Sequence, residues 1–592
     1  MGQRMSKYDD LSREQLIALM EKRDRTKKLG LVWERDEIEA DNAVDSNFVS
    51  ATLVPELSDK AAPWRNMVIE GDNYDALRWL RMTMAGQIKC IYIDPPYNTG
   101  TKDWVYNDHY ANPEDTYFHS TWLEFLFRRL TLARDLLAED GVILVSINDD
   151  QRAKLELLMD EALPGMRIGS FVWKTRPGTK GEGAYLSQDH EHVLVYGKSA
   201  FRFGGSPVDV GKYSNDDNDP RGPWSSTTLQ KNASFKDRPN SYFPVQDPQT
   251  EFWYPCNPNR VWSFQKRSMK SARGDTFEDL YESNQIIFTK RTEFQEFHSL
   301  SEMLQAIDEE TAHRFLRRDI PDLDFWVGKK IGLGSVRRKL FLKDLKQDTK
   351  PVSSWANAEA VNPEANVIAA GMNQEGSKTV QSIFGSRAFD YAKPVSLIRE
   401  LVRQSTGPGD TVLDFFAGSA TTAQAVMELN AEDGGERRFI MVSSTEATTD
   451  NPGKNLCRDV TAERIRRLNA SNDKKFAALS ASFAYLRCRE IEFEDLDYEF
   501  APTEVWAALE TLHRLPLTNY VEAPWQEHKT DEQTLIFADR VGTALLDHLR
   551  GVADRRENAF VYSWAPGQIT AGIGEVLDVR SVRDELVGRF RQ

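Results

Sequence analysis

The sequence predicts an α/β protein with a doubly wound, Rossmann-like sheet that is interrupted by a large insert. Two observations predict this class. Apolar, strand-like runs end in an acid at residues 91–94 and again at residues 411–414, and the second run leads into a small-residue turn and a helical pattern. At 592 residues the chain is long enough for several domains with ample core.

The N-terminal segment, residues 1–60, is predicted to hold one helix and a linker. Ser12 and Gln15 have the spacing of a capping box, and Leu11 and Leu16 are placed as a hydrophobic staple, so a helix is expected through about Arg25. Residues 40–57 mix Asp, Asn, Ser and Pro with little periodicity, which predicts a linker.

The most informative stretch follows the strand at residues 91–93 and reads Asp94, Pro95, Pro96, Tyr97. An exocyclic base amine is a poor nucleophile because its lone pair is delocalised into the ring, and two hydrogen-bond acceptors on its N–H groups would counter this. Asp94 offers a carboxylate and Pro95 a carbonyl, while Pro96 stiffens the loop. Tyr97 offers a flat face to a base that has left its duplex. A plain strand-ending turn is the alternative.

The next elements fit the same sheet. Residues 120–137 have the apolar periodicity of an amphipathic helix, and residues 141–149 read as a buried strand with a helix entry, where Asp149 and Asp150 are predicted to cap the helix. Residues 190–196 read as a further strand. It places His190 and His192 on one face with no third ligand in view, so we expect no metal site.

The second motif, residues 411–422, is a short strand, a small-residue turn and a helix start. Such a turn lets backbone amides at a helix N-terminus approach a ligand closely. A second strand, residues 438–446, ends in Glu446, where a doubly wound fold places a carboxylate on ribose hydroxyls. The pairing favours an adenosine-containing cofactor over a plain βαβ unit.

Together these motifs resemble the DNA amino-methyltransferases that use S-adenosyl-L-methionine. The catalytic motif precedes the cofactor turn and a long insert separates them, as in the permuted β class. The resemblance is strongest to the Mod (modification and recognition) subunits of type III restriction-modification systems, through residues 30–34, 69–77 and 98–100. It covers roughly residues 30–200 and 380–470. One departure is Ala420, where the family turn often has Gly; we expect cofactor binding to be retained.

The resemblance implies a site-specific DNA methyltransferase that modifies N6 of a flipped adenine and supplies sequence recognition to a type III complex. It implies double-stranded DNA, a second copy of the chain and a Res helicase-nuclease subunit as partners. The alternatives are an N4-cytosine enzyme, in which Ser more often replaces Asp94, a solitary adenine methyltransferase, and a non-enzymatic DNA-recognition module. The implied catalytic residues are Asp94, Pro95, Pro96 and Tyr97, and the implied cofactor-binding residues are Asp414, Phe416, Ala417, Gly418, Ser419, Glu446, Lys393 and Pro394.

The net charge of −16 is unfavourable for a DNA-binding protein, but it is unevenly distributed. Residues 171–350 carry 28 Lys and Arg against 25 Asp and Glu, or +3, which leaves −19 for the remainder. This region alternates basic clusters, among them residues 337–339, with aromatics, which favours a target-recognition domain over a merely solvated face. The residues expected to contact DNA are Lys174, Arg176, Lys180, Lys266, Arg267 and Lys270.

The domains expected from these patterns are a methyltransferase catalytic half at residues 61–200, a target-recognition domain at 201–385, a cofactor-binding half at 386–485 and a C-terminal α/β or α+β domain at 486–592. The four cysteines have no metal-ligand spacing, and no signal peptide or long apolar span is visible, so we expect a cytoplasmic protein with no membrane association. No P-loop or nuclease pattern is present.

Overall fold

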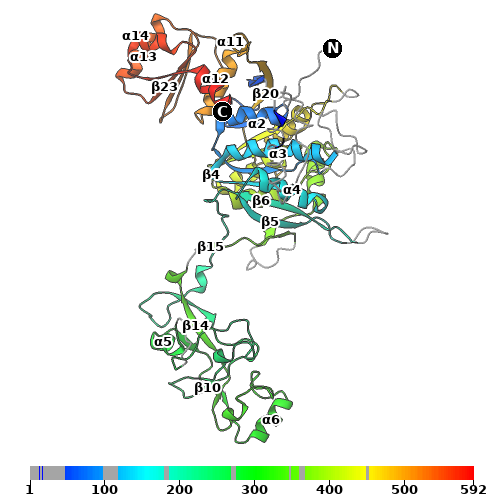
Figure 1. Cartoon of the computed structure of the whole chain (residues 1–592), viewed down its shortest axis with the longest axis vertical. Coiled ribbons are helices and arrows are strands. Elements are labelled where there is room, and N and C mark those ends of the chain that lie inside the picture. Colours follow the sequence, from blue (N-terminus) through cyan, green and yellow to red (C-terminus); the bar gives the residue numbers. More distant parts are fainter. Residues whose placement is uncertain are drawn as a thin grey trace. The chain divides into compact units, whose positions relative to one another are not determined.

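The computed structural model describes residues 47–97, 118–178, 186–268, 275–345, 349–358, 367–447 and 452–591, together with Ser12, Arg13 and Ile17. The chain forms two compact units (Figure 1). The first unit is Met1–Ser206 with Pro351–Gln592, and the second unit is Pro207–Lys350. The expected N-terminal helix lies outside the described residues apart from three positions, and residues 30–34 and 98–100 lie wholly outside them.

An eleven-stranded sheet forms the centre of the first unit. Its strands are β1 (Asn47–Leu53), β2 (Asn66–Glu70), β3 (Ile88–Ile93), β4 (Leu137–Ile147), β5 (Arg167–Lys174), β6 (His190–Gly197), β16 (Trp355–Asn357), β17 (Ile368–Ala369), β18 (Thr411–Asp414), β19 (Arg438–Ser443) and β20 (Phe483–Glu492). Their order is β1-β20-β2-β19-β18-β3-β4-β6-β5-β16-β17. The group from β20 to β4 is parallel, whereas β6 is antiparallel to β4 and β5.

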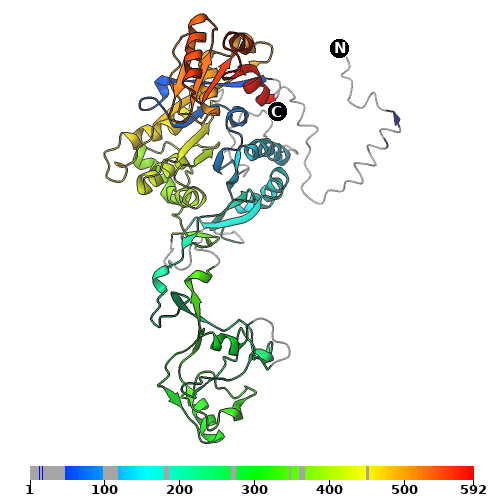
Figure 2. The same cartoon turned by 90° about the vertical axis from the view of Figure 1, so that its left-hand side faces the viewer.

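Two helical layers cover the faces of this sheet (Figure 2). Alternate residues of β3 divide between them, because successive side chains of a strand point to opposite faces: Ile91 and Ile93 belong to one core, Cys90 and Tyr92 to the other. Burial on both faces explains why the parallel strands read as continuous apolar runs. One core holds α2 (Asn73–Met84), α3 (Phe118–Leu136) and α4 (Asp149–Ala162); the other holds α8 (Val395–Ser405), α9 (Thr421–Asp433) and α10 (Glu463–Asn469).

The predicted helix at residues 120–137 and the strand that follows it are confirmed as α3 and β4, with β4 starting earlier than expected. The predicted cap of α4 is wrong by one residue. Asn148 is the N-cap, since its side chain accepts a hydrogen bond from the Gln151 amide at 3.1 Å, and Asp149 and Asp150 lie in the first turn. Acids are favourable there because they interact with the positive end of the helix dipole.

Three expected boundaries differ from the structure. The expected linker at residues 40–57 contains β1, which pairs antiparallel with β20. That pairing also places the start of the expected C-terminal domain, at residue 486, inside the main sheet. Residues 351–384, assigned from sequence to the insert, belong to the first unit: β16 pairs with β5, and α7 (Asn373–Phe384) follows. Short strands completed by distant partners carry no local periodicity that would reveal them.

The second unit is built on short strands (Figure 1), and aromatic side chains make up much of its core. Two small sheets have the orders β12-β13-β10-β9 and β11-β14-β8, and the helices are short. The elements are β8 (Trp224–Thr228), β9 (Val245–Gln246), β10 (Trp253–Tyr254), β11 (Ile286–Phe288), β12 (Phe294–Gln295), β13 (Ile331–Gly332), β14 (Val336–Phe341), α5 (Phe277–Glu282) and α6 (Leu300–Asp308). Much of its surface is therefore made of loops, which is where binding side chains are most often placed.

The C-terminal part of the first unit adds a four-stranded sheet, β21 (Trp525–Lys529), β22 (Thr534–Ala538), β23 (Ala559–Ser563) and β24 (Asp578–Ser581), in that order. The helices α13 (Thr543–Asp554) and α14 (Pro566–Ile573) pack on it with a small core of their own. The helices α12 (Pro502–Leu512) and α15 (Gly588–Arg591) join the core around α2 instead. None of the described helices has both the length and the apolar composition needed to cross a bilayer.

Candidate active site

The two sequence motifs meet at the centre of the main sheet. They lie about 320 residues apart in the chain, yet β3 and β18 are neighbours, with Ile91 paired to Leu413. From β18 the chain passes through α9 to β19 on one side, and from β3 it passes through α3 to β4 on the other. The strand order therefore reverses between β3 and β18. Ligands of open α/β sheets bind in the crevice at the carboxyl ends of such strands.

Asp414 closes the cofactor turn on itself. One carboxylate oxygen accepts a hydrogen bond from the Phe416 amide at 3.0 Å, and the other accepts one from the Thr422 hydroxyl at 2.5 Å. Burial raises the pKa of Asp414 to about 7; the two hydrogen bonds oppose the shift, and the negative charge of Asp94 adds to it. Both oxygens of Asp414 thus hold the turn in shape, and its predicted role in cofactor binding stays a prediction.

The turn requires its small residues. Gly418 has a φ of +46°, and a Cβ there would lie 2.9 Å from Cζ of Phe389. Ala420, the N-cap of α9, also has a left-handed φ of 58° and makes no side-chain cap. The amide of Ala417 donates to the Val442 carbonyl at 3.1 Å, which ties the turn to β19. An uncapped helix start leaves backbone N–H groups for a ligand.

A buried arginine, Arg464, donates hydrogen bonds to the cofactor turn. The guanidinium of Arg464 on α10 donates to the carbonyl of Ser419 at 2.8 Å and to the side chains of Ser419, Thr421 and Gln424. All of these acceptors are neutral, and burial lowers the pKa of Arg464 to about 10. Sequence reasoning missed this residue, because an arginine in a helical pattern usually lies on the solvated face.

The first motif is held by its neighbours as well as by its prolines. The indole Nε1 of Trp122, on α3, donates to the Pro96 carbonyl at 2.8 Å. The hydroxyl of Tyr97 donates to Asp94 at 2.8 Å, and burial together with the nearby carboxylates raises the pKa of Tyr97 well above its ordinary value. Within the described part of the chain the Pro95 carbonyl accepts no hydrogen bond. It therefore remains an acceptor for a ligand.

Lys393 lies at the first motif in this structure. Its Nζ is 2.9 Å from a carboxylate oxygen of Asp94, 3.5 Å from Glu191 and 4.8 Å from the centre of the Tyr97 ring. The sequence assigned it to the methionine end of a cofactor, beside Pro394, which is the N-cap of α8. Sequence reasoning did not include Glu191. The signal that could have found it is the reversed direction of β6, which brings the start of that strand to the edge where β3 ends.

The remaining cofactor residues border the same edge. Glu446 follows β19 with a φ of 50°, and its carboxylate pairs with Lys454 at 2.6 Å. The ring of Phe416 packs between those of Phe415 and Phe125, with centroids 5.2 and 6.1 Å away. Glu446 lies three residues beyond the end of β19, the strand beside β18, and its predicted contact with ribose hydroxyls stays a prediction.

The two histidines of β6 do have a neighbouring acid. Ligand atoms of Asp149, His190 and His192 lie within 4.8 Å of one another, and Nε2 of His192 is 3.1 Å from Asp149. We expected no third ligand beside the two histidines, and this expectation is wrong because α4 begins beside β6 and brings Asp149 to them. Burial lowers the pKa of His192 and favours its neutral form, which accounts for the contact as a hydrogen bond.

The basic residues expected to contact DNA are dispersed. Lys174 and Arg176 lie at and after the end of β5 in the first unit, and Arg176 is exposed. Lys266 lies in the second unit, 5.0 Å from the centre of the Phe243 ring. The neighbouring Arg267 pairs with Asp279 at 2.6 Å and Glu282 at 2.9 Å, so its charge is already balanced. Lys180 and Lys270 lie outside the described residues.

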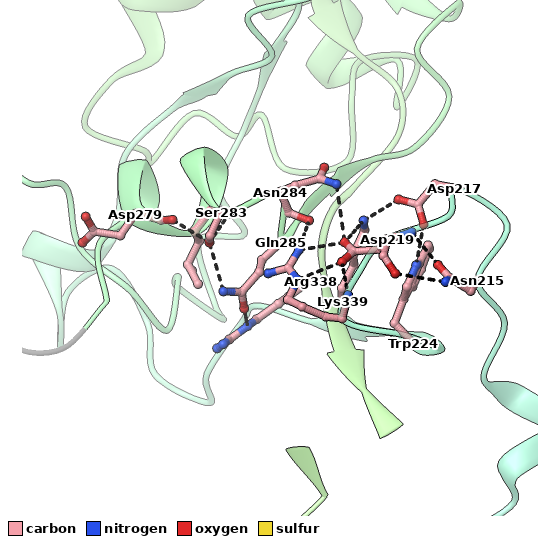
Figure 3. Close-up of polar contacts among 12 residues, drawn as sticks. Asn215, Asp217, Asp219, Trp224, Asp279, Ser283, Asn284, Gln285, Arg338 and Lys339 are labelled. Atoms are coloured by element: carbon pink, nitrogen blue, oxygen red, sulfur yellow. Dashed lines mark hydrogen bonds and ion pairs between the residues drawn. The ribbon is translucent and has the colours of Figure 1, made fainter. Parts of the chain in front are cut away.

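The basic side chains of residues 337–339 mainly form hydrogen bonds and ion pairs within the second unit. Figure 3 shows Lys339 within a network around Asp217 and Asp219. Its Nζ is buried and donates to Asp219 at 2.9 Å, while Nε of Arg338 donates to Gln285 at 3.0 Å. A buried, paired lysine is not available to phosphates. Basic clustering in sequence therefore overstated the free positive charge of this strand.

The fold and site define a class: a doubly wound α/β protein with a small-residue turn at a helix start and, after the adjacent strand, a carboxylate and a backbone carbonyl that can accept hydrogen bonds. Residues 88–448 match the DNA methylase family. Because the match covers more than half of the chain, this protein belongs to the DNA methylase family.

Curated relatives agree with this family. The chain is 30% identical over 436 residues to the type III restriction-modification enzyme StyLTI Mod subunit of Salmonella typhimurium LT2, covering 68% of this chain and 57% of the relative. It is 30% identical over 422 residues to the EcoPI Mod subunit of Escherichia phage P1, covering 64% of this chain and 58% of the relative. The matched region thus spans less than two thirds of each relative.

Solved structures give a weaker comparison. The PvuII DNA methyltransferase, described as cytosine-N4-specific, is 11% identical, with a TM-score of 0.29 over 70% of this chain and 97% of that chain. The M1.HpyAVI structure with bound S-adenosyl-L-methionine gives 12% identity and a TM-score of 0.26, over 64% and 94%. Scores this low add nothing to the assignment, which depends on the family match and the strand order.

Proposed function

We propose that this chain is a site-specific DNA methyltransferase that transfers a methyl group from S-adenosyl-L-methionine to N6 of an adenine flipped out of its duplex. The observation that carries the proposal is the meeting of Asp94 and Asp414 at the ends of adjacent parallel strands. One strand ends in acceptors for an amine, and the other leads into a turn suited to a cofactor. Membership of the DNA methylase family supports it.

The residues around the turn fit the proposed cofactor. Gly418 has no side chain and lets the Phe389 ring pack against the turn, α9 begins without a side-chain cap, and Glu446 follows the end of the next strand. These features suit a ligand with a polar tail and ribose hydroxyls. When bound, S-adenosyl-L-methionine supplies a methyl group activated by its sulfonium. Asp414 and Arg464 keep the turn in shape.

The residues of the first motif act on the base. A carboxylate oxygen of Asp94 and the Pro95 carbonyl accept from the two N–H groups of the amine and draw its nitrogen toward a tetrahedral geometry. Tyr97 supplies the surface on which the ring stacks, once the base has left its duplex. The proton displaced from the nitrogen has the Asp94 carboxylate beside it. Positioning and a fixed polar environment account for the catalysis, with no covalent intermediate.

The choice of adenine depends on Asp94. A carboxylate at this position favours N6-adenine, whereas Ser is more frequent in the N4-cytosine enzymes that the resemblance also includes. The relatives described as type III Mod subunits support a role in a restriction-modification system with a Res partner and a second copy of the chain. In this proposal, loops of the second unit read the target sequence, and Lys266 and the exposed Arg176 contact phosphates.

The test is methyl transfer by the purified full-length chain. It is incubated with mixed-sequence DNA and deuterium-labelled S-adenosyl-L-methionine, and the nucleosides are resolved by mass. Labelled N6-methyladenine is expected, with none from an Asp94→Ala variant that unfolds at the same temperature. Labelled N4-methylcytosine alone would replace the adenine assignment. Specific DNA binding with no transfer would favour a recognition module without enzymatic activity.

A further inference from the structure

Lys393 occupies the place that the proposed function assigns to the target base. Its Nζ lies 4.8 Å from the centre of the Tyr97 ring, whereas stacked rings have centroids 4.5–7 Å apart. The same Nζ is 2.9 Å from Asp94, the predicted acceptor of the base amine. A base and this ammonium group therefore cannot hold both contacts at once.

Charge keeps the lysine there when the site has no base. Its side chain is 10% exposed, and burial alone would favour the neutral amine, but the carboxylates of Asp94 and Glu191 raise the pKa of Lys393 above its ordinary value. A charged donor forms stronger hydrogen bonds to a carboxylate than a neutral base amine does. A base can displace it only if the ammonium group keeps another partner.

Glu191 is that partner. Its carboxylate is already 3.5 Å from Nζ and 3.2 Å from the Tyr97 hydroxyl, so it adjoins both groups. Its backbone is fixed in β6, opposite Trp173 of β5. The side chain of Lys393 has a flexible four-carbon stem, while its backbone is held next to Pro394 at the start of α8. A rotation of the stem can therefore move the ammonium group from Asp94 toward Glu191 without leaving it unpaired.

We propose that Lys393 and Glu191 form an exchange pair that controls entry of the base. In the free protein the ammonium group of Lys393 pairs with the Asp94 carboxylate and lies over the Tyr97 ring. A flipped base displaces it, and Glu191 then holds the ammonium group beside the occupied pocket. Both are positioning residues for the exocyclic amine of the base, and this inference rests on the proposed function.

The test measures base flipping directly. A duplex with the methylated sequence, identified from the chain's own product DNA, carries 2-aminopurine next to the target adenine; its fluorescence rises when that adenine leaves the base stack. Lys393→Met is expected to raise the flipped fraction in the absence of cofactor by about 5-fold or more, the lower end of usual coupling between competing ligands. Glu191→Gln is expected to lower the flipped fraction, because the displaced ammonium group loses its charged partner.

The double variant separates exchange from general damage. If the pair exchanges, Glu191→Gln has no further effect on the flipped fraction once Lys393 is Met. Should Lys393→Met fail to fold, Lys393→Arg serves, since a bidentate pair with Asp94 should reduce flipping. Unchanged or reduced flipping in a folded Lys393→Met overturns the inference.

Wild-type activity separates this inference from the proposed function. If the natural chain methylates the unlabelled duplex but Lys393→Met does not promote flipping, only the exchange pair is wrong. If the natural chain methylates no DNA, the proposed function itself fails. Separate measurement of KM and kcat gives a second readout. Because displacement of Lys393 precedes the chemical step, Lys393→Met should lower the KM for DNA.

Discussion

Two aspartates end adjacent parallel strands, and their partners differ. Asp414 gives both carboxylate oxygens to its own turn, through Phe416 and Thr422. Asp94 pairs instead with side-chain groups that can move, the Tyr97 hydroxyl and the Lys393 ammonium. The first is a fixed structural acid, and the second is an acid whose partners a ligand can replace. The difference supports the proposal that the turn holds the cofactor and that Asp94 contacts the reacting base.

The largest expected effect follows from removing the charge of Asp94. Asp94→Asn should lower the rate of methyl transfer by about 10²–10³-fold, the usual cost of losing one fixed group that stabilises a transition state. Cofactor affinity should not change, because Asp94 is no part of the turn. Single-turnover rates with labelled cofactor measure this. Asp140→Asn, a substitution at an exposed acid, is the control; an equal loss there would make the effect nonspecific.

The second prediction concerns how the contribution of Asp414 to the free energy of unfolding changes with pH. The folded protein holds this proton more tightly than the unfolded chain, since burial raises the pKa from 3.8 to about 7. The stability so gained is complete below pH 4 and is lost as the pH rises through 7. Between pH 5 and 7 the loss from this group should be about 2 kcal/mol. Urea unfolding without cofactor should show a flatter pH dependence for Asp414→Asn; an unchanged slope would contradict the assignment.

A third prediction uses a matched pair of glycines at the two ends of α9. Gly418 and Gly434 both have positive φ, of 46° and 70°, but only Gly418 has a neighbour that a Cβ would meet. Alanine at either position should cost about 1–2 kcal/mol of backbone strain. Only Gly418→Ala should weaken S-adenosyl-L-methionine binding, by about 5- to 30-fold. Equal affinities in the two variants, measured by calorimetry, would remove the turn from the cofactor site.

The smallest effect is expected at Ala420. Its left-handed φ is strained for alanine, so Ala420→Gly relieves strain of about 1–2 kcal/mol. Removing a fully buried methyl costs about 0.8 kcal/mol, and glycine loses more chain entropy on folding. These terms nearly cancel, and the change in unfolding free energy should be under about 1 kcal/mol. A larger change in thermal denaturation would mean that the alanine has a further role at the turn.

Sequence predicted the ends of β3 and β18 well, because buried parallel strands give continuous apolar runs and their ends are marked by Asp94 and Asp414. It could not predict what pairs with these acids. Lys393 and Glu191 reach Asp94 from α8 and β6, and only the sheet order brings those elements together. Lys339 shows the same limit, since a basic run cannot reveal that Asp219 is buried beside it.

The most direct test of the central claim uses the whole cell. Methylation-sensitive sequencing compares DNA from cells that express the full-length chain with DNA from cells that express Asp94→Ala at the same level. The expected result is modified adenine at one recurring sequence with the natural chain and no such modification with the variant. Full modification by Asp94→Ala would contradict the claim that the strand ending in Asp94 forms the active site.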